Sequence, residues 1–240
     1  MYKFLLQPKW IATHILVITL MVVMVNLATW QLDRHQQRKD FNATLVQRFE
    51  APIRPLEELL QSGDPADIEW MPTALTGTYL QGEDISLVNV SQNGAAGYDA
   101  ITPLLLSDGK VVLVNRGFLP LASEFPPAPT GEISLLGRVR ASSERRTGEL
   151  SDPATGELTD VQRIDIARLQ QQIDGELVPV YVQLLNSTPA EPSSLSTIVD
   201  PDFSNGPHLS YTVQWILFAL CAAGGWVVLV RREVTKQKAA

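Results

Sequence analysis

The histidines limit the chemistry that this chain can perform. There are only three in 240 residues, and His14, His35 and His208 all lie within or next to two long apolar runs near the ends of the chain. The single cysteine, Cys221, lies within the second run. The segment between the runs therefore excludes Ser-His-Asp and Cys-His nucleophilic sites, zinc sites with His or Cys ligands, and disulfides.

His208 has the most suggestive surroundings of the three. It follows Pro207 in the segment PHLSYTVQW, and proline suits the first turn of a helix, so we expect a helix to begin here. Four residues at i, i+3, i+4 and i+7 then form one polar and aromatic stripe: His208, Tyr211, Thr212 and Trp215. Polar groups on a membrane helix usually face protein or a cavity. A neutral imidazole there can ligate haem iron, and a contact with lipid headgroups is the alternative.

A second polar group follows the first apolar run. On a continuing helix, Gln31 and Arg34 are three residues apart and Trp30 and Arg34 are four apart, so these side chains can share one face. An interfacial anchor explains the same residues, with the Trp in an aromatic belt and the Arg among headgroups.

Depth in the membrane restricts which histidines can act together. His14 precedes Trp30 by 16 residues, which is ~24 Å along a helix. We therefore expect His14 at the opposite interface from His208, where it cannot ligate the same iron. His35 can approach the depth of His208.

The elements that must position these residues are the two apolar runs. Residues 11–30 and 211–230 are each about 20 residues long, enough to cross a hydrocarbon core. We place the spans at 11–32 and 207–230. A cleaved signal peptide is the alternative for the first run, but the run exceeds a typical signal core of ~7–15 residues and no A-x-A-like site follows it. We therefore interpret it as a retained anchor.

Charge predicts the orientation in the membrane. Six basic residues lie in the tails, residues 1–10 and 231–240: Lys3, Lys9, Arg231, Arg232, Lys236 and Lys238. A long connecting segment translocates largely regardless of its charge. Residues 33–210 carry 25 acidic and 13 basic side chains, a net charge of −12, which suits neither nucleic acid nor an anionic membrane surface. We expect a multi-pass protein of the bacterial inner membrane, with both tails cytoplasmic and residues 33–206 forming a periplasmic domain.

The domain between the spans is predicted to be α+β and mainly antiparallel. Residues 33–50 continue the first helix with an apolar stripe of Phe41, Leu45 and Phe49, and a short helix follows over 56–61. Alternating and β-branched segments predict strands at 73–79, 85–90, 100–106, 111–115, 134–141 and 177–185. SDGK predicts a hairpin turn at 107–110, and the remaining segments are a mobile loop at 142–160, a short helix at 166–173 and a connector at 189–207.

Three motifs resemble, in the same chain order, the Surfeit locus protein 1 family of cytochrome c oxidase assembly factors. They are WQLDR at 30–34, VLVNRGFLP at 112–120 and NGPHLSYTVQW at 205–215. Two terminal spans around one external domain are that family's layout, so the likeness covers nearly the whole chain. The sequence differs in having Ala28 where glycine is common, Phe118 in place of a usual Trp, and no Trp-Lys pair after Arg34.

The resemblance implies a non-enzymatic role in the maturation of subunit I of a haem-copper oxidase, including the handling of haem a. It implies that His208 is the haem-iron ligand and that Trp30, Gln31 and Arg34 lie near the same membrane face. We add Tyr211 and Trp215 to this candidate cofactor site, and we hypothesise that the Arg34 guanidinium pairs with a haem propionate. Expected partners are oxidase subunit I, haem a synthase and the bilayer.

Two alternatives remain at this stage. A cofactor-free membrane scaffold that stabilises an assembly intermediate of subunit I fits the same layout, and a tethered periplasmic enzyme would depend on an acid pair. No phosphate-binding glycine loop or other recognisable catalytic motif supports the enzyme. Asn115, Arg116 and Gly117 also match the family, but a turn at the end of a strand explains them equally well.

Overall fold

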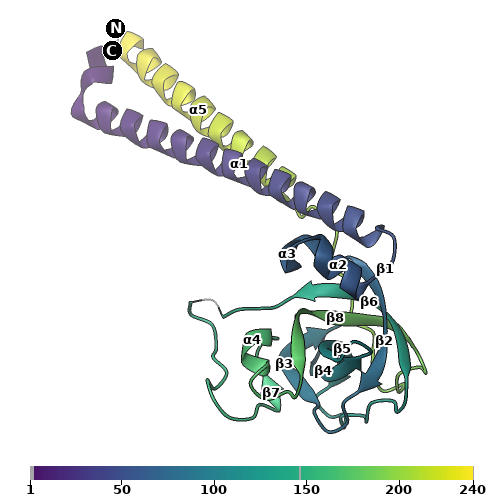
Figure 1. Cartoon of the computed structure of the whole chain (residues 1–240). Helices are drawn as coiled ribbons and strands as arrows, with labels where there is room; N and C mark the ends of the chain where they lie inside the picture. The colour runs from purple at the N-terminus through teal and green to yellow at the C-terminus, as the bar shows by residue number, and fades with distance from the viewer. Residues whose placement is uncertain (1–2, 146, 240) are drawn as a thin grey trace. The chain divides into compact units, whose positions relative to one another are not determined.

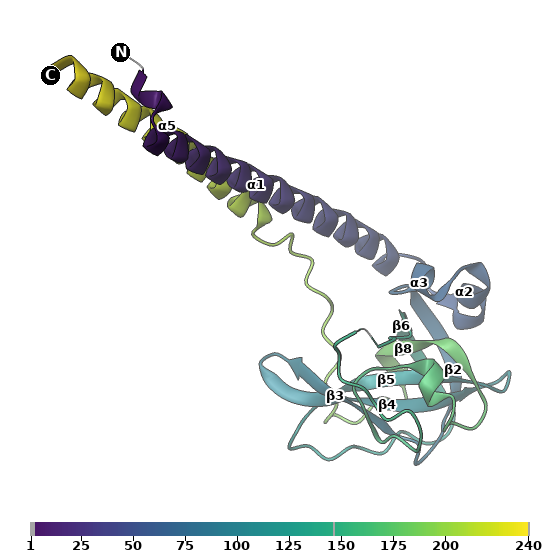
Figure 2. The ribbon, with the colours of Figure 1, turned by 90° about the vertical axis from the view of Figure 1, so that its left-hand side faces the viewer.

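The computed structural model describes residues 3–145 and 147–239 (Figures 1 and 2). The chain divides into two compact units. A helical unit comprises Met1–Thr44 and Asp202–Ala240, and a barrel unit comprises Leu45–Pro201.

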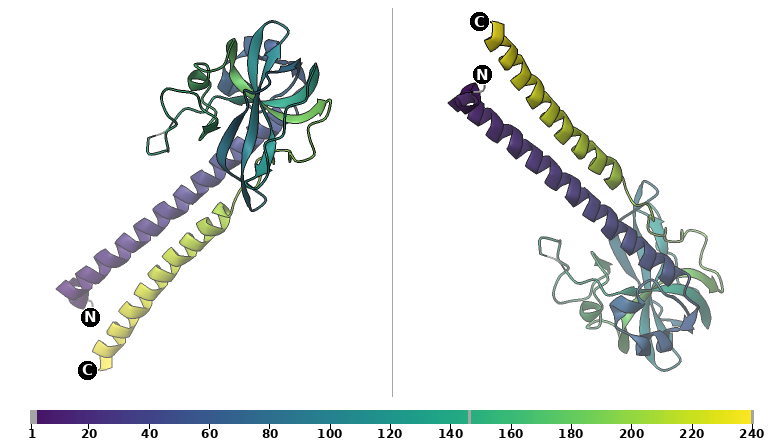
Figure 3. Two further views of the ribbon diagram at one scale, coloured as in Figure 1. Left: turned by 90° about the horizontal axis from the view of Figure 1, so that it is seen from below. Right: turned by 90° about the horizontal axis from the view of Figure 1, so that it is seen from above.

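The helical unit is an antiparallel pair. The short helix η1 (Lys3–Leu6) precedes α1 (Pro8–Phe49). The last helix, α5 (His208–Ala239), lies antiparallel beside α1 (Figure 3). Both helices are long and apolar enough to cross a membrane. The predicted continuation of the first helix beyond residue 33 is confirmed, because α1 ends only at Phe49.

The two helices face each other along a seven-residue repeat. On α1, less exposed residues recur in alternating steps of four and three: Trp10, His14, Val17, Met21, Met24, Ala28, Gln31, His35, Arg38 and Asn42. On α5 the same steps connect His208, Thr212, Trp215, Ala219, Ala222 and Trp226. We call these two rows the seam. A sustained seven-residue repeat keeps one face of each helix turned toward its partner, and the small residues Ala28 and Ala219 are almost fully buried in its middle.

The predicted apolar stripe on the continuation of α1 is only partly correct. Leu45 is buried and the Phe49 ring lies against Trp70, but Phe41 is 46% exposed. The seven-residue repeat explains the difference, because it turns Arg38 and Asn42 inward at this level and leaves Phe41 outside. The Arg38 guanidinium lies over the exposed Phe41 ring, 5.5 Å from its centroid.

The barrel unit is built on a closed ring of strands. The strands are β1 (Arg54–Pro55), β2 (Pro72–Tyr79), β3 (Ile85–Gln92), β4 (Ala95–Leu106), β5 (Lys110–Pro120), β6 (Ile133–Ala141), β7 (Asp160–Val161) and β8 (Glu176–Thr188). Their order is β1-β2-β6-β8-β5-β4-β3-β7, and an additional pairing of β2 with β4 closes β2, β6, β8, β5 and β4 into a barrel. Closure removes the free edges from these five strands.

Alternation along the strands separates two apolar cores. On β5, Val112 and Val114 belong to one buried cluster and Val111 and Leu113 to another, so the clusters lie on opposite faces of the strand. The first cluster fills the barrel and is capped by α2 (Leu56–Ser62) and α3 (Pro65–Ile68). The second lies outside the barrel, beneath the segment that contains α4 (Ile166–Leu169).

The structure confirms all six predicted strands and the mainly antiparallel class. Gly109 adopts a φ of +86° in the predicted hairpin turn between β4 and β5. The helix predicted over 166–173 is shorter, since α4 ends at Leu169, and α3 was not predicted. Residues 142–145 and 147–159 contain no helix or strand, as expected for a loop. The parallel pairing of β5 with β8 and the closure of the barrel were not predicted.

Candidate functional site

The connector end of the helix pair, where α5 begins, pairs two residues of the candidate site. The Nδ1 atom of His208 lies 2.8 Å from the Oε1 atom of Gln31. An amide oxygen can only accept a hydrogen bond, so Nδ1 carries the proton and donates it. In its neutral form the imidazole is then the tautomer whose Nε2 atom carries the lone pair, which is the form that ligates a metal ion.

Gly206 leaves space beside that nitrogen. Its φ is +66°, a conformation that glycine adopts without strain. A Cβ atom at this position would lie 3.4 Å from both Nε2 and Cδ2 of His208. The absence of a side chain at residue 206 therefore keeps the lone-pair edge of the imidazole open.

Two seam residues of α1 hold the segment that leads into α5. The Arg38 guanidinium donates to the Asp202 and Ser204 carbonyls at 2.7 and 3.2 Å. The Asn42 side chain, which is 8% exposed, donates from Nδ2 to the Phe203 carbonyl at 2.7 Å. The expected helix start is confirmed, because α5 begins at His208 and Tyr211 N donates to the Pro207 carbonyl. Arg38 and Asn42 thus position the start of α5, which carries His208.

The other candidate residues divide between the seam and the surface. Trp30 is 49% exposed, and the Arg34 guanidinium lies 5.7 Å from its ring centroid on the same exposed face. Tyr211 is also exposed, whereas Trp215 lies on the seam and packs edge-on against Phe218. The structure therefore brings His208 and Gln31 together and pairs Trp30 with Arg34. The predicted stripe on α5 is divided, with Tyr211 off the seam.

The terminal end of the helix pair, near both chain termini, holds the opposite arrangement. The Trp226 indole Nε1–H donates to the Nδ1 atom of His14 at 2.9 Å. An indole nitrogen can only donate, so Nδ1 carries the lone pair and the proton of the neutral ring is on Nε2. Seventeen residues separate His14 from Gln31, about 25 Å along α1. His14 therefore lies far from the His208 site.

His35 lies on the seam one turn after Gln31. Its Nδ1 atom is buried and has no hydrogen-bond partner among the residues that the structure describes. The three polar residues His35, Arg38 and Asn42 were not identified as seam residues from the sequence. The signal that could have found them is the seven-residue repeat itself, which continues through them after the apolar residues end.

The central matched motif lies within a strand rather than at its end, so the expectation of a strand-ending turn is wrong. Opposite Ala100–Ile101 of β4, the register skips Arg116, which is the extra residue of a β-bulge. Its guanidinium is buried and pairs with Glu191 at 2.8 Å, and it donates to the Pro126 and Pro127 carbonyls. This network joins β5 to two loops. Gly117 has a φ of +146°, and a Cβ there would lie 2.7 Å from the Ser196 carbonyl oxygen.

A second polar group is buried beside this motif. The Asn115 side chain donates to Oδ2 of Asp99 at 2.8 Å, while Oδ1 of Asp99 has no partner among the described residues. Burial raises the pKa of the Asp99 carboxyl to about 6, and the hydrogen bond from Asn115 opposes this shift. Burial raises the pKa of the Tyr181 hydroxyl, and the charge of Asp99 adds a smaller effect in the same direction.

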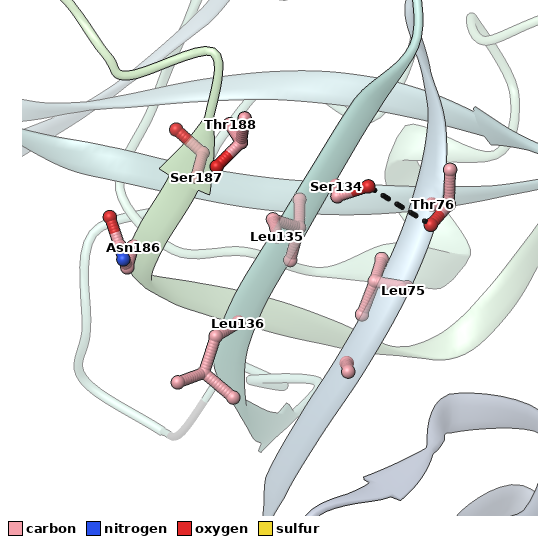
Figure 4. Close-up of a pocket in the computed structure, with 9 residues that line it drawn as sticks. Leu75, Thr76, Ser134, Leu135, Leu136, Asn186, Ser187 and Thr188 are labelled. Carbon is pink, nitrogen blue, oxygen red and sulfur yellow. Dashed lines mark hydrogen bonds between the residues drawn. The ribbon is translucent and has the colours of Figure 1, made fainter.

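The surface of the barrel also offers a shallow hollow of about 300 Å³ over β2, β6 and β8 (Figure 4). Its lining is entirely uncharged, and the Thr76 and Ser134 hydroxyls lie 3.5 Å apart across it. Because none of its side chains can act as an acid or base near neutral pH, the hollow is not a candidate catalytic site.

The sequence is similar to known proteins along nearly its whole length. The chain is 27% identical to an uncharacterized SURF1-like protein of Mycobacterium tuberculosis, over 98% of this chain and 88% of that protein. It is 28% identical to a SURF1-like protein of Monosiga brevicollis, covering 88% and 85%. It is 24% identical to Surfeit locus protein 1 of Gallus gallus, covering 90% and 74%. The SURF1 family model matches residues 18–220, which include the whole barrel and part of each long helix. The chain therefore belongs to the SURF1 family.

Proposed function

We propose that this protein is an assembly factor for a haem-copper cytochrome c oxidase and that it holds haem a for subunit I. The observation that carries the proposal is the His208–Gln31 hydrogen bond, which leaves the His208 Nε2 lone pair free. The proposal is also supported by membership of the SURF1 family, which is a family of oxidase assembly factors.

The residues at the connector end fit a haem group. His208 would ligate the iron through Nε2, Gln31 would hold the imidazole in the ligating tautomer, and Gly206 leaves room for a ring at that nitrogen. When bound, haem a supplies the redox-active iron of the oxidase. The exposed Arg34 guanidinium would form paired hydrogen bonds with a propionate, and the Tyr211 and Trp215 rings offer apolar faces for the macrocycle.

The proposed setting is the bacterial inner membrane. α1 and α5 are each long and apolar enough to cross it, with spans at residues 11–32 and 207–230. The tails at 1–10 and 231–240 carry six of the basic residues, which favours a cytoplasmic location for them. Residues 33–206 would then be periplasmic. At this depth the His208 imidazole lies at the outer face of the bilayer, from which a haem can pass sideways to another membrane protein.

The protein acts in this proposal by binding and transfer rather than by catalysis. Subunit I of the oxidase would be the recipient of the haem, and haem a synthase would be its source.

The test is to purify the full chain in mild detergent from cells that make haem a, and to record its visible spectrum. We expect a Soret band with about one haem per chain, and loss of at least nine-tenths of it in His208→Ala. His14→Ala is the matched control and should retain haem, because His14 lies about 25 Å along α1 from Gln31, the partner of His208.

Oxidase assembly in the same cells separates the haem carrier from a cofactor-free scaffold. The haem carrier predicts that His208→Ala also lowers the amount of mature oxidase. Normal assembly with His208→Ala, together with failure when residues 45–201 are deleted, would support the scaffold and contradict a haem-carrying role.

A further inference from the structure

The segment that leads from the barrel unit toward α5 is bound to the barrel before it enters the helical unit. Phe118 and Ser196 exchange two backbone hydrogen bonds, at 2.8 and 2.9 Å. The Gln92 side chain then donates to the Thr197 carbonyl at 3.0 Å and accepts from the Val199 N–H at 3.1 Å. We call residues 196–200 the strap. Because its backbone groups are paired with the barrel, the strap has already lost much of the conformational freedom of a linker.

Arg138 of β6 holds both the end of the strap and the end of α1. Its guanidinium pairs with the Asp200 carboxylate and lies over the Phe49 ring, 3.8 Å from the ring centroid. Phe49 is the last residue of α1. The chain passes between its two units at two places, after Thr44 within α1 and after Pro201 at the end of the strap. One arginine therefore contacts both of the segments that join the units.

On the other side of Pro201, α1 holds the chain again. The Arg38 guanidinium donates to the Asp202 carbonyl at 2.7 Å. Asp200 and Asp202 are thus each held by an arginine, with only Pro201 between them. Proline fixes its own φ and restricts the residue before it, so this step of the chain has little freedom. The position of Asp200 is therefore passed on to the segment that leads to His208.

These contacts and the chain between them form a closed loop. From Asp200 the chain reaches His208, which pairs with Gln31. From Gln31, α1 continues without a break to Phe49, and Arg138 joins Phe49 to Asp200. Closing one contact of such a loop raises the effective concentration of the groups at the other. The hydrogen bond between His208 and Gln31 is therefore coupled to the contacts of Arg138.

We propose that Arg138 is a positioning residue for the His208 site, through which the barrel unit controls how firmly the His208 imidazole is held against Gln31. This inference deepens the proposed function, on which its haem measurements rest, but its first test needs no haem. The coupling is reciprocal, so a haem bound at His208 also stabilises the strap.

The ring nitrogens of His208 give the first test, in the haem-free full chain labelled with nitrogen-15 histidine. In the wild type we expect the proton on Nδ1, where Gln31 accepts it. In Arg138→Gln we expect a measurable share of the other tautomer, because the start of α5 moves more freely. The chemical shifts of the two nitrogens should therefore approach each other. The signals of His14 should not change.

Arg140→Gln is the matched control. Arg140 lies two residues along the same strand and on the same face. Its guanidinium is 3.6 Å from the Trp70 ring centroid and 3.2 Å from the Glu69 carboxylate. Its loss should lower the thermal stability of the barrel unit to a similar extent. Neither of these partners belongs to a segment that joins the units, so the His208 signals should stay as in the wild type.

Asp200→Asn is a second variant, which removes one partner of Arg138 at a position that is 45% exposed and so should not prevent folding. It should shift the His208 signals in the same direction as Arg138→Gln, but less, because the contact with Phe49 remains. Adding it to Arg138→Gln should change nothing further, as expected of two partners in one contact.

Haem provides the reciprocal measurement. Its affinity should fall about threefold in Arg138→Gln and stay unchanged in Arg140→Gln. Bound haem should also slow amide hydrogen exchange in the strap of the wild type, but not in Arg138→Gln. Identical His208 signals in the wild type and Arg138→Gln would contradict the positioning role, and so would an equal change in Arg140→Gln. A wild-type chain that binds no haem would contradict the proposed function alone, because the tautomer test does not use haem.

Discussion

The two ends of the helix pair use the same side chain in opposite ways. At the connector end, His208 donates from Nδ1 to an amide oxygen of Gln31. At the terminal end, His14 accepts at Nδ1 from the indole N–H of Trp226. In the neutral rings, the Nε2 atom therefore has a lone pair in His208 and carries a proton in His14. The residue across the seam, rather than the histidine, decides which chemistry is available.

The comparison also shows how each end is built. The connector end is rich in polar seam residues, and the side chains of Arg38 and Asn42 satisfy backbone carbonyls there. The terminal end has an apolar cavity that is lined by residues of both helices, with His14 and Trp226 among them. The two ends of the helix pair therefore differ in the polarity of their seam residues.

Removing the acceptor at the connector end should have the largest effect. In Gln31→Leu nothing holds the proton on Nδ1 of His208, so both tautomers are populated and the imidazole is less well oriented. We expect the affinity for haem to fall about 10- to 100-fold, the usual effect of losing a partner of a metal ligand. Haem titration of the detergent-solubilised protein measures it. Gln36→Leu, an exposed change one helical turn away, should have little effect, and equal losses in both variants would contradict the role of Gln31.

Adding a methyl group beside the lone pair should have the next largest effect. In Gly206→Ala the new Cβ lies 3.4 Å from Nε2 of His208 and the backbone stays in a region that alanine disfavours. We expect about a tenfold loss of haem affinity in the same titration. Gly225→Ala is the control, since no atom lies within 4 Å of a Cβ there. Unchanged haem binding in Gly206→Ala would mean that the ring approaches His208 from another side.

Loosening the segment before α5 should have a smaller effect. Asn42→Leu removes the donor to the Phe203 carbonyl at a buried position, which should destabilise the helical unit by about 1–3 kcal/mol. Because His208 itself is unchanged, we expect only a severalfold loss of haem affinity. Thermal unfolding and haem titration, with exposed Gln47→Leu as the control, measure the two effects. A loss as large as that of Gln31→Leu would show that Asn42 contacts the ligand.

The substitution Asp99→Asn in the barrel unit should leave haem binding unaffected and alter only the pH dependence of the free energy of unfolding. The pKa of Asp99 is about 6 in the folded chain, above its ordinary value of 3.8, so the folded state binds the proton more tightly. Stability is therefore lost as the pH rises from about 4 to above 6, by on the order of 3 kcal/mol. In Asp99→Asn this loss is absent.

Urea unfolding at pH 4.5 and pH 7.5 measures the effect of Asp99. We expect the variant to gain stability relative to the wild type at the higher pH and much less at the lower one. The same difference between the two proteins at both pH values would show that Asp99 does not titrate as its burial suggests.

Local sequence patterns were sufficient to predict several helices, strands and turns. Two uninterrupted apolar runs predict α1 and α5, the proline at position 207 predicts the start of the second helix, and the SDGK turn predicts the hairpin of β4 and β5. The motif that contains His208 also singled out the histidine that the structure places against Gln31.

Other features depend on residues that are far apart in the chain. The partner of His208 is 177 residues away, and the Trp226 partner of His14 is 212 residues away. Arg116 looks like a turn residue locally, and only the bulge opposite Ala100–Ile101 turns it into the buried network. Closure of the barrel depends on the pairing of β2 with β4, which no local signal specifies. The hydrogen-bond partners of His208 and His14 therefore depend on long-range pairing, and local sequence patterns could not predict them.

Nitrogen-15 NMR of histidine-labelled protein tests the central claim most directly, because the chemical shift of a ring nitrogen differs strongly with and without a proton. His14→Phe and His208→Phe would assign the signals in the haem-free protein. We predict a protonated Nδ1 and an unprotonated Nε2 for His208, and the reverse for His14. Finding the proton of His208 on Nε2 would contradict the proposal that this imidazole is prepared to ligate iron.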